Sequence, residues 1–202
     1  MLESLLYPKT VAVIGASRTP GKVGYEIATN LIDSNFEGDI VPVNPSGGEL
    51  LGHRLYKSLE EYGMPVEMSV IAVPTAAVKE AVASSLHAGA KSVVIVTAGF
   101  REVGEEGACL EREITALCRA AGARLMGPNC LGLINTHHNL NASFGRFMPG
   151  RGGISVLSQS GALCTAILDW AASRKMGLAT LLSISKSQQP YTFTYDPISP
   201  IE

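Results

Sequence analysis

The chain has 202 residues, a formal net charge of −2 and a charged fraction of 17%, which is below the roughly 25% usual for soluble proteins. Because 46% of the residues are hydrophobic, burial can offset the entropy lost on ordering, and this excludes an intrinsically disordered protein. Positive and negative residues are interspersed, so the sequence offers no basic block for nucleic acid or for an anionic membrane surface.

No apolar run approaches the ~20 residues that a membrane span requires. The acidic start Met1-Leu2-Glu3-Ser4 lacks the basic and apolar regions of a signal peptide. The four cysteines, at positions 109, 118, 130 and 164, form no C-x-x-C pair and no disulfide framework. We therefore expect a cytoplasmic protein with reduced thiols and no metal site.

Short runs of consecutive apolar residues recur along the first part of the chain. They are Val11–Ile14, Ile40–Val43, Val70–Val73, Val93–Val96 and Leu125-Met126. Strands that are buried on both faces have this pattern, which is typical of a parallel sheet. Apolar residues recur at helical spacing between them, in the stretches Val23–Leu31, Val78–Leu86 and Leu110–Ala121. The alternation predicts a doubly wound, Rossmann-like α/β domain over residues 1–128.

Residues 129–150 interrupt this alternation, because Asn, Gly, Pro and His dominate there, and we expect a long connecting segment. A further β-α-β unit is predicted over residues 151–185. Its expected elements are a strand at Ile154–Leu157, a helix whose apolar stripe is Leu163, Ile167, Trp170 and Ala171, and a strand at Ala179–Ile184. One such unit is the start of a second, incomplete α/β domain. Residues 186–202 show neither the helical nor the strand periodicity of apolar residues, and they are expected to form an irregular tail.

The segment Gly15-Ala16-Ser17-Arg18-Thr19-Pro20-Gly21-Lys22-Val23-Gly24 joins the first strand to the first helix. A small-residue turn there directs backbone N–H groups and the positive end of the helix at an anion, usually a phosphate. A tight turn without a ligand is the alternative. Ser17 replaces the second glycine of the dinucleotide fingerprint, and Asn44-Pro45 stands where a ribose-binding acid belongs, so the pattern disfavours NAD. The spacing of Gly15, Gly21 and Lys22 excludes a Walker A loop.

Three further segments follow later strands: Val43-Asn44-Pro45, Thr97-Ala98-Gly99-Phe100 and Gly127-Pro128-Asn129-Cys130-Leu131-Gly132. In this order, and with the turn at Gly15, they resemble the CoA-binding domain of the nucleoside-diphosphate-forming acyl-CoA synthetases. That family includes ADP-forming acetate–CoA ligase and the α subunit of succinyl-CoA synthetase. The segment Ile154–Gly161 is similar to the start of that family's second, flavodoxin-like domain.

The resemblance implies binding of CoA or acyl-CoA beyond the carboxyl ends of the strands. The implied contacts are Gly15, Ala16, Ser17, Arg18 and Lys22 for phosphate, Asn44 and Pro45 beside the adenosine, Val73, Pro74, Thr97, Ala98 and Gly99 along the pantetheine arm, and Asn129 and Cys130 toward the thiol. Relatives commonly have a basic residue after Asn-Pro, whereas this chain has Ser46, and Lys22 or Arg18 is the expected substitute.

Ser158, Ser160 and Gly161 are implied to steady a phosphoryl group at a second helix start, with an ordinary serine N-cap as the alternative. Cys130 either forms a mixed disulfide with CoA or is a buried structural thiol. The other three cysteines are interpreted as small apolar helix residues.

The family's reaction uses an acyl phosphate, CoA and a transiently phosphorylated histidine. None of the histidines at positions 53, 87, 137 and 138 stands in a matching motif, so we expect the catalytic histidine beyond this chain. The implied partner is a β-type ATP-grasp subunit or domain, in a homo- or hetero-oligomer. A CoA-responsive regulatory or interaction module, and an NAD-binding Rossmann protein, are the alternatives.

Overall fold

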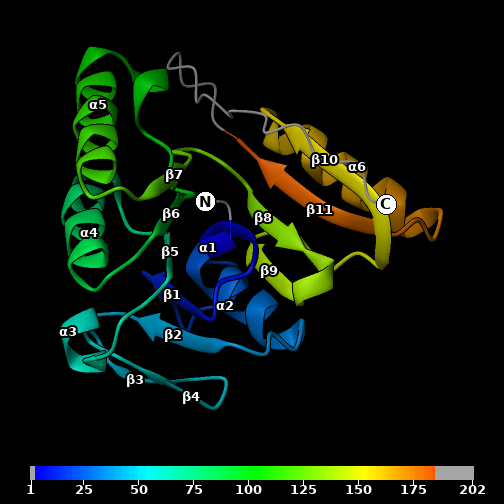
Figure 1. Cartoon of the computed structure of the whole chain (residues 1–202), viewed down its shortest axis with the longest axis horizontal. Coiled ribbons are helices and arrows are strands. Elements are labelled where there is room, and N and C mark those ends of the chain that lie inside the picture. The colour runs from blue at the N-terminus through cyan, green and yellow to red at the C-terminus, as the bar shows by residue number, and fades with distance from the viewer. Residues whose placement is uncertain (1–2, 185–202) are drawn as a thin grey trace, which may run out of the picture.

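A computed structural model describes residues 3–184 of the chain, so the tail expected over residues 186–202 lies outside the described residues. Five strands form the first sheet, in the order β2-β1-β5-β6-β7, and every neighbouring pair is parallel (Figure 1). The bounds are β1 Thr10–Ile14, β2 Asp39–Val43, β5 Met68–Ile71, β6 Ser92–Ile95 and β7 Arg124–Met126. The predicted doubly wound α/β fold is confirmed.

The third of these strands, β5, begins and ends two residues before the predicted run Val70–Val73. Ala72 still donates its N–H to Ile14 O at 2.8 Å. Val73 has left the ladder, and its carbonyl accepts a hydrogen bond from a loop hydroxyl instead. The apolar run therefore continues from the strand into the loop that lines the edge of the sheet.

Helices cover both faces of this sheet (Figure 1). Helix α2 (Val23–Asp33) lies on one face, while α4 (Thr75–His87) and α5 (Glu105–Ala120) pack side by side on the other. Ile27, Ala28 and Leu31 of α2 are fully buried. The stripe predicted for α2 is thus confirmed, although Val23, at the start of α2, is 41% exposed. In α4 and α5 the buried members are Val78, Val82, Ile114 and Cys118, while Ala121 is exposed just after α5.

A β-hairpin and a short helix follow β2, in a stretch where the sequence predicted no regular element. The hairpin consists of β3 (Gly48–Leu50) and β4 (His53–Leu55), and α3 spans Leu59–Tyr62. Its two-residue turn, Leu51-Gly52, has positive φ at both positions, as hairpins with primed turns require. The chain then returns to the end of β2 through a parallel bridge between Val43 and Tyr56.

The second sheet has four strands in the order β10-β11-β8-β9. Strands β10 (Arg151–Ser158) and β11 (Leu178–Ser183) are parallel and flank α6 (Gly161–Ser173), so the predicted β-α-β unit forms. The long connection expected over residues 129–150 is wrong in its secondary structure, because it contains β8 (Gly132–Asn135) and β9 (Leu140–Ser143). Both strands run antiparallel to their neighbours within this sheet.

Helix α2 also packs against β9, so it joins the two sheets. Its Asn30 Nδ2 donates to the carbonyls of Ser143 at 2.8 Å and Gly145 at 2.7 Å. Leu133, Leu140 and Ala142 share one hydrophobic core with residues of β1 and α2.

The first helix, α1, spans Glu3–Leu6.

The apolar stripe predicted for α6 is only partly correct. Ala171 is buried, but Leu163 and Trp170 are 52% and 53% exposed. The face of α6 that packs on β10 and β11 instead presents Cys164 and Leu168. The difference arises because α6 is apolar around most of its circumference, so periodicity alone does not select the buried face.

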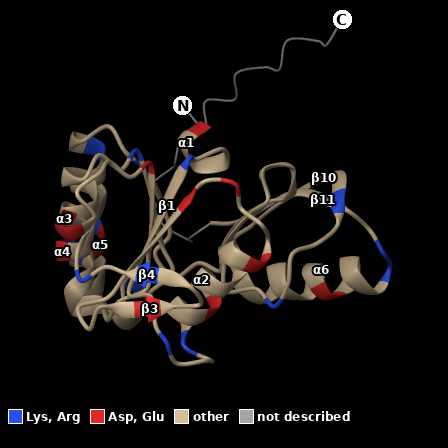
Figure 2. Cartoon of the chain, turned by 90° about the horizontal axis from the view of Figure 1, so that it is seen from below, with Lys and Arg blue, Asp and Glu red and all other residues tan. Residues whose placement is uncertain are grey.

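None of the helices within residues 3–184 is long and apolar enough to cross a membrane. Charged residues of both signs are distributed over the surface, as Figure 2 shows.

Candidate functional site

The strand order of the first sheet changes direction beside β1. The chain passes from β1 outward to β2 and then returns to place β5 on the other side of β1. In open α/β sheets, ligands bind beyond the carboxyl ends of the strands that flank such a switch point. The loops that follow β1, β2, β5, β6 and β7 therefore define the candidate site.

The turn after β1 packs directly against the loop after β5. Gly15 has φ +91°, and a Cβ atom there would lie 2.5 Å from Ala72 O and 2.9 Å from Val73 Cγ1. Gly24 of α2 packs just as closely against the backbone of this turn, because a Cβ atom at position 24 would overlap the Gly15 carbonyl. Glycine at both positions lets the turn, the helix and the β5 loop come together.

The N–H groups of this turn differ in their availability to an anion. Those of Gly15 and Ala16 donate to Val43 O at 2.9 and 3.1 Å. Those of Ser17 and Arg18 have no acceptor within the described part of the chain. The donors that remain for a phosphate are therefore at Ser17 and Arg18 rather than at the first two residues of the turn.

The start of α2 adds further donors. The N–H groups of Val23 and Gly24 have no acceptor among residues 3–184, and Lys22 at the N-cap forms no side-chain cap. Glu26 is the acidic residue of this first turn, and its carboxylate accepts from the Gly21 N–H at 2.9 Å. The positive end of α2 is thus available to a ligand anion.

Asn44 connects the turn after β2 to the turn after β1. Its Nδ2 donates to Ala16 O at 2.8 Å, and its Oδ1 accepts from Ser46 N at 2.9 Å and Ser46 Oγ at 2.8 Å. The Gly47 N–H closes the turn on Asn44 O at 2.9 Å. Pro45 is exposed at the tip of this turn. The amide of Asn44 is therefore a structural link, and Pro45 presents a surface beside it.

The loops after β5, β6 and β7 are joined in the same way. Thr97 Oγ1 donates to Val73 O at 2.7 Å, and Thr75 Oγ1 donates to Ala98 O at 2.8 Å. The Asn129 N–H donates to Thr97 O at 2.9 Å. Hydrogen bonds thus hold the three loops side by side along the edge of the sheet.

Glu102 strengthens this connection, and the sequence did not identify it. Its Oε1 accepts from the Gly99 N–H at 2.7 Å and from Asn129 Nδ2 at 3.1 Å. Burial raises the pKa of Glu102, but the hydrogen bonds from the N–H groups of Gly99, Glu102 and Phe100 outweigh it, and the pKa lies below its usual value. Its position two residues after the Thr97–Phe100 motif was the available signal.

A cavity of about 670 Å³ lies where this edge meets the second sheet. Its lining comes from the β6 and β7 loops, α5, the residue after β9 and the start of α6. It comprises Arg101, Glu102, Glu111, Asn129, Cys130, Leu131, Phe144, Gln159, Ser160, Gly161, Ala162 and Thr165. The Cys130 thiol donates to Ile95 O at 3.3 Å, and burial raises its pKa to about 12. These facts favour the structural role for Cys130 over a mixed disulfide.

The start of α6 faces the same cavity. Ser160 is the N-cap, since its Oγ accepts from the Leu163 N–H at 3.2 Å, and Ser158 Oγ accepts from the Ser160 N–H at 3.1 Å. The N–H groups of Gly161 and Ala162 find no acceptor in the described chain. Ser160 is therefore a helix cap, and the N–H groups of Gly161 and Ala162 that follow it remain open to an anion.

Arg101 and Glu111 form an ion pair in the wall of the cavity, with 3.6 Å between Nη2 and Oε1. Glu111 is 4% exposed, and neither its Oε1 nor Arg101 Nε has a hydrogen-bond partner within the described residues. The sequence did not single out either residue. Position 111 lies three residues before Ile114 of the predicted apolar stripe, but helical spacing gives no indication of a buried carboxylate.

The structure brings the predicted residues of the first domain to one edge of its sheet, where the loop after β2 lies beside the loop after β1, followed by the loops after β5, β6 and β7. They are Gly15, Ala16, Ser17, Arg18, Lys22, Asn44, Pro45, Val73, Pro74, Thr97, Ala98, Gly99, Asn129 and Cys130. Ser160 and Gly161 lie at the cavity, and Ser158 is hydrogen-bonded to Ser160.

Other residues considered from the sequence lie elsewhere. His87 ends α4, and His138 Nε2 is within 2.8 Å of Pro8 O. Cys118 and Cys164 are buried as expected, but Cys109 is exposed on α5. No group of three or more His, Cys, Asp or Glu side chains between residues 3 and 184 is arranged to hold a metal ion.

Two family descriptions match the chain. Residues 9–136 match the CoA binding domain, and residues 151–189 match the succinyl-CoA ligase like flavodoxin domain. An acetate–CoA ligase [ADP-forming] of Methanocaldococcus jannaschii is 45% identical over 183 residues, which are 91% of this chain and 25% of that protein. The α subunit of acetate–CoA ligase [ADP-forming] I of Pyrococcus furiosus is 42% identical over 187 residues, 91% of this chain and 40% of the subunit.

Solved structures are similar over the same region. A crystal structure of a Pyrococcus horikoshii protein superposes with a TM-score of 0.88 and 38% identity, covering 92% of this chain and 42% of that one. The dinucleotide forming acetyl-coenzyme A synthetase 1 of Candidatus Korarchaeum cryptofilum, in complex with phosphate and ADP, has a TM-score of 0.87 and 34% identity, covering 92% and 39%. The chain spans between a quarter and about two fifths of these relatives.

Proposed function

Because this chain belongs to the CoA-binding domain family of the ADP-forming acyl-CoA synthetases, we propose that it binds CoA or acyl-CoA along the carboxyl edge of its first sheet. The observation that carries the proposal is the continuous series of loops joined by Asn44, Thr97 and Asn129. An extended ligand with phosphates at one end and a thiol at the other matches a site of this shape.

The pyrophosphate of CoA is proposed to lie against the N–H groups of Ser17 and Arg18 and the start of α2, with Lys22 beside it. These donors have no other partner within residues 3–184, and the helix end is positive. Gly15 and Ala16 are proposed to support this phosphate site by holding the turn in place, since their N–H groups donate to Val43 O.

The adenosine is proposed to lie over Asn44 and Pro45, and the pantetheine arm to follow the loops after β5 and β6. The residues assigned to the arm are Val73, Pro74, Thr97, Ala98 and Gly99. Backbone groups and small or apolar side chains suit an arm that contains amides and methylene groups. The thiol end then reaches Asn129 and the cavity beside Cys130.

The cavity is proposed to receive the reacting group. The N–H groups of Gly161 and Ala162, after the capping Ser160, form the positive start of α6 and suit a phosphoryl oxygen or a thiolate. Ser158 supports Ser160 through their hydrogen bond. This arrangement provides electrostatic stabilisation of developing negative charge.

The acyl-transfer activity of the whole ligase is proposed to require a phosphohistidine and an ATP-grasp β-type subunit or domain, neither of which we assign to residues 3–184. The naming of a relative as an α subunit supports a multi-subunit ligase. We infer that the chain alone binds CoA without turnover.

Titration calorimetry with CoA, NAD and ATP tests this proposal. We expect a single CoA site per chain, with NAD and ATP at least a hundredfold weaker. Binding of NAD in preference to CoA would overturn the proposal. A synthetase assay with acetate, ATP and CoA, with and without an ATP-grasp β subunit, separates a ligase component from a CoA-responsive module.

A further inference from the structure

The turn after β2 lacks a basic residue of its own, yet two cations from other segments converge on it. A Cβ atom at Gly47 would lie 3.2 Å from Lys57 Cε, and a Cβ atom at Gly48 would lie 3.4 Å from Arg18 Nη1. Gly47 and Gly48 are consecutive, so their Cα atoms are only about 3.8 Å apart. Arg18 arrives from the turn after β1, whereas Lys57 arrives from the segment after the hairpin.

The fold fixes the position of Lys57 firmly. Tyr56, the preceding residue, donates its N–H to Pro42 O at 2.9 Å and accepts from the Asn44 N–H at 2.8 Å. The Lys57 N–H donates to Glu61 Oε2 at 2.6 Å. The backbone on both sides of this lysine is therefore held beside the end of β2, which directs its side chain across Gly47.

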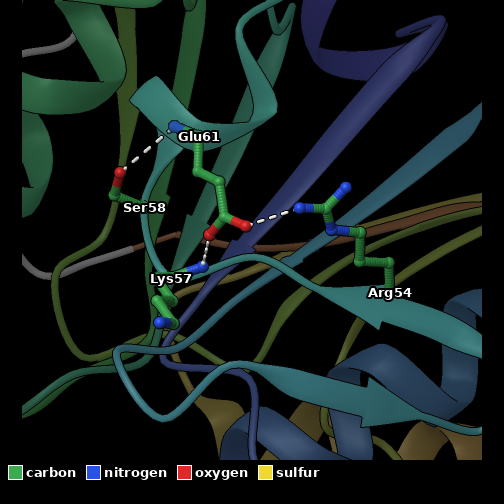
Figure 3. A network of polar contacts seen from close by, with 4 residues as sticks. All are labelled: Arg54, Lys57, Ser58 and Glu61. Atoms are coloured by element: carbon green, nitrogen blue, oxygen red, sulfur yellow. Dashed lines mark hydrogen bonds and ion pairs between the residues drawn. The ribbon is translucent and has the colours of Figure 1, made fainter.

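Neither cation forms a salt bridge with an acid in the described part of the chain, although the charge of Lys57, after hydrogen bonds from the Lys57 N–H and Arg54, helps to lower the pKa of Glu61. No carboxylate among residues 3–184 lies within 4.0 Å of the charged groups of Arg18 or Lys57. The neighbouring Arg54 is different, because it pairs with Glu61 at 2.6 Å. Figure 3 shows that Glu61 is occupied by Arg54 and by the Lys57 backbone, while the Lys57 ammonium lies away from it.

Ser46 itself does not provide an anion donor. Its hydroxyl and its N–H both donate to Asn44 Oδ1, at 2.8 and 2.9 Å. Two unpaired positive charges that converge on one turn repel each other unless an anion lies between them. A phosphomonoester is the best match, because it carries close to two negative charges near pH 7 and several acceptor oxygens.

We propose that Lys57, together with Arg18, binds the 3′-phosphate of CoA and makes the site selective for CoA over 3′-dephospho-CoA. This inference rests on the proposed function, since it assigns one phosphate of the ligand proposed there. Lys57 supplies the positive charge that Ser46 lacks. The sequence suggested Lys22 or Arg18 for this role, and of these only Arg18 is among the close neighbours of Gly47 and Gly48.

The test compares the dissociation constants of CoA and 3′-dephospho-CoA by titration calorimetry for the wild type, Lys57→Ala, Lys57→Arg and Arg18→Ala. We expect wild type to prefer CoA by about tenfold or more, as for hydrogen bonds between charged groups. Lys57→Ala is expected to lower CoA affinity about three- to tenfold, because the site is exposed, and to leave 3′-dephospho-CoA affinity unchanged. Lys57→Arg retains the preference.

Lys91→Ala is the matched control, because Lys91 is an exposed lysine that precedes β6 at the opposite edge of the sheet. It is expected to bind both ligands as wild type does. If Lys57→Ala keeps the full preference for CoA, the inference is wrong and the proposed function stands. If the folded wild type binds neither ligand, the proposed function fails, and the assignment of Lys57 fails with it.

Discussion

The side-chain amide of Asn129 donates a hydrogen bond to Glu102 Oε1 at 3.1 Å, and the same oxygen accepts the Gly99 N–H at 2.7 Å. One carboxylate oxygen therefore joins the loop after β6 to the loop after β7. These loops border the cavity where the thiol end of CoA is proposed to lie. We therefore propose that Glu102 is a positioning residue, which acts on the ligand through Gly99 and Asn129.

Replacing Glu102 tests this positioning role. Glu102→Ala removes the shared acceptor and is expected to lower CoA affinity about five- to tenfold by titration calorimetry, since the acceptor is charged but solvent-exposed. Glu102→Gln retains an acceptor oxygen and should restore most of the affinity. Glu106→Ala, at an exposed position in the first turn of α5, serves as the control. Wild-type affinity in Glu102→Ala would contradict the role.

The same carboxylate predicts a dependence of stability on pH. The pKa of Glu102 in the folded chain lies below the usual 4.5, so its ionised form favours folding. Its contribution is fully present above the unfolded pKa and is lost as the pH falls through the folded pKa. The difference in unfolding free energy between wild type and Glu102→Gln, from urea titrations, should be constant above about pH 5 and shrink in acid. A difference that grows toward low pH is the contrary result.

Two glycines with positive φ offer a matched comparison of backbone strain and crowding. A Cβ atom at Gly15 (φ +91°) would lie 2.5 Å from Ala72 O, whereas a Cβ atom at Gly21 (φ +82°) would have nothing within 4 Å. Gly21→Ala is expected to cost about 1 to 2 kcal/mol from φ alone. Gly15→Ala should cost roughly 2 kcal/mol more from the clash. Urea unfolding measures both, and equal losses would show that the close approach is unimportant.

The thiols are expected to react in an order set by their exposure. Cys109 is exposed, whereas burial raises the pKa of Cys118 to about 11 and that of Cys130 to about 12. A thiol reagent at pH 7.5 should therefore modify one cysteine quickly in the native chain, and Cys109→Ser should abolish that fast phase. Peptide mapping identifies the site. Fast modification of Cys130 would contradict its structural role and favour a mixed disulfide with CoA.

The first sheet was predictable because its strands are buried on both faces and therefore consist of consecutive apolar residues. Strands β8 and β9 were not, because polar residues occur inside them. Asn135, Asn141 and Ser143 are buried, and Asn135 Nδ2 is satisfied by Leu6 O, 129 positions away in the chain. A local pattern cannot show that such a residue has a distant partner.

The candidate site was predictable where a loop directly follows a strand, as at Asn44 and Thr97. Lys57 was not predictable, because the hairpin β3–β4 separates it from the turn it reaches, and only the bridge between Val43 and Tyr56 brings it back. Glu111 was missed because helical spacing indicates burial but not the partner of a buried charge.

A crystal structure of the chain with bound CoA tests the central claim most directly. We predict CoA along the carboxyl edge of the first sheet, with its pyrophosphate at Ser17, its 3′-phosphate between Arg18 and Lys57, and its thiol beside Asn129. CoA bound at another surface, such as the opposite edge of the sheet near Lys9 and Lys91, would contradict it.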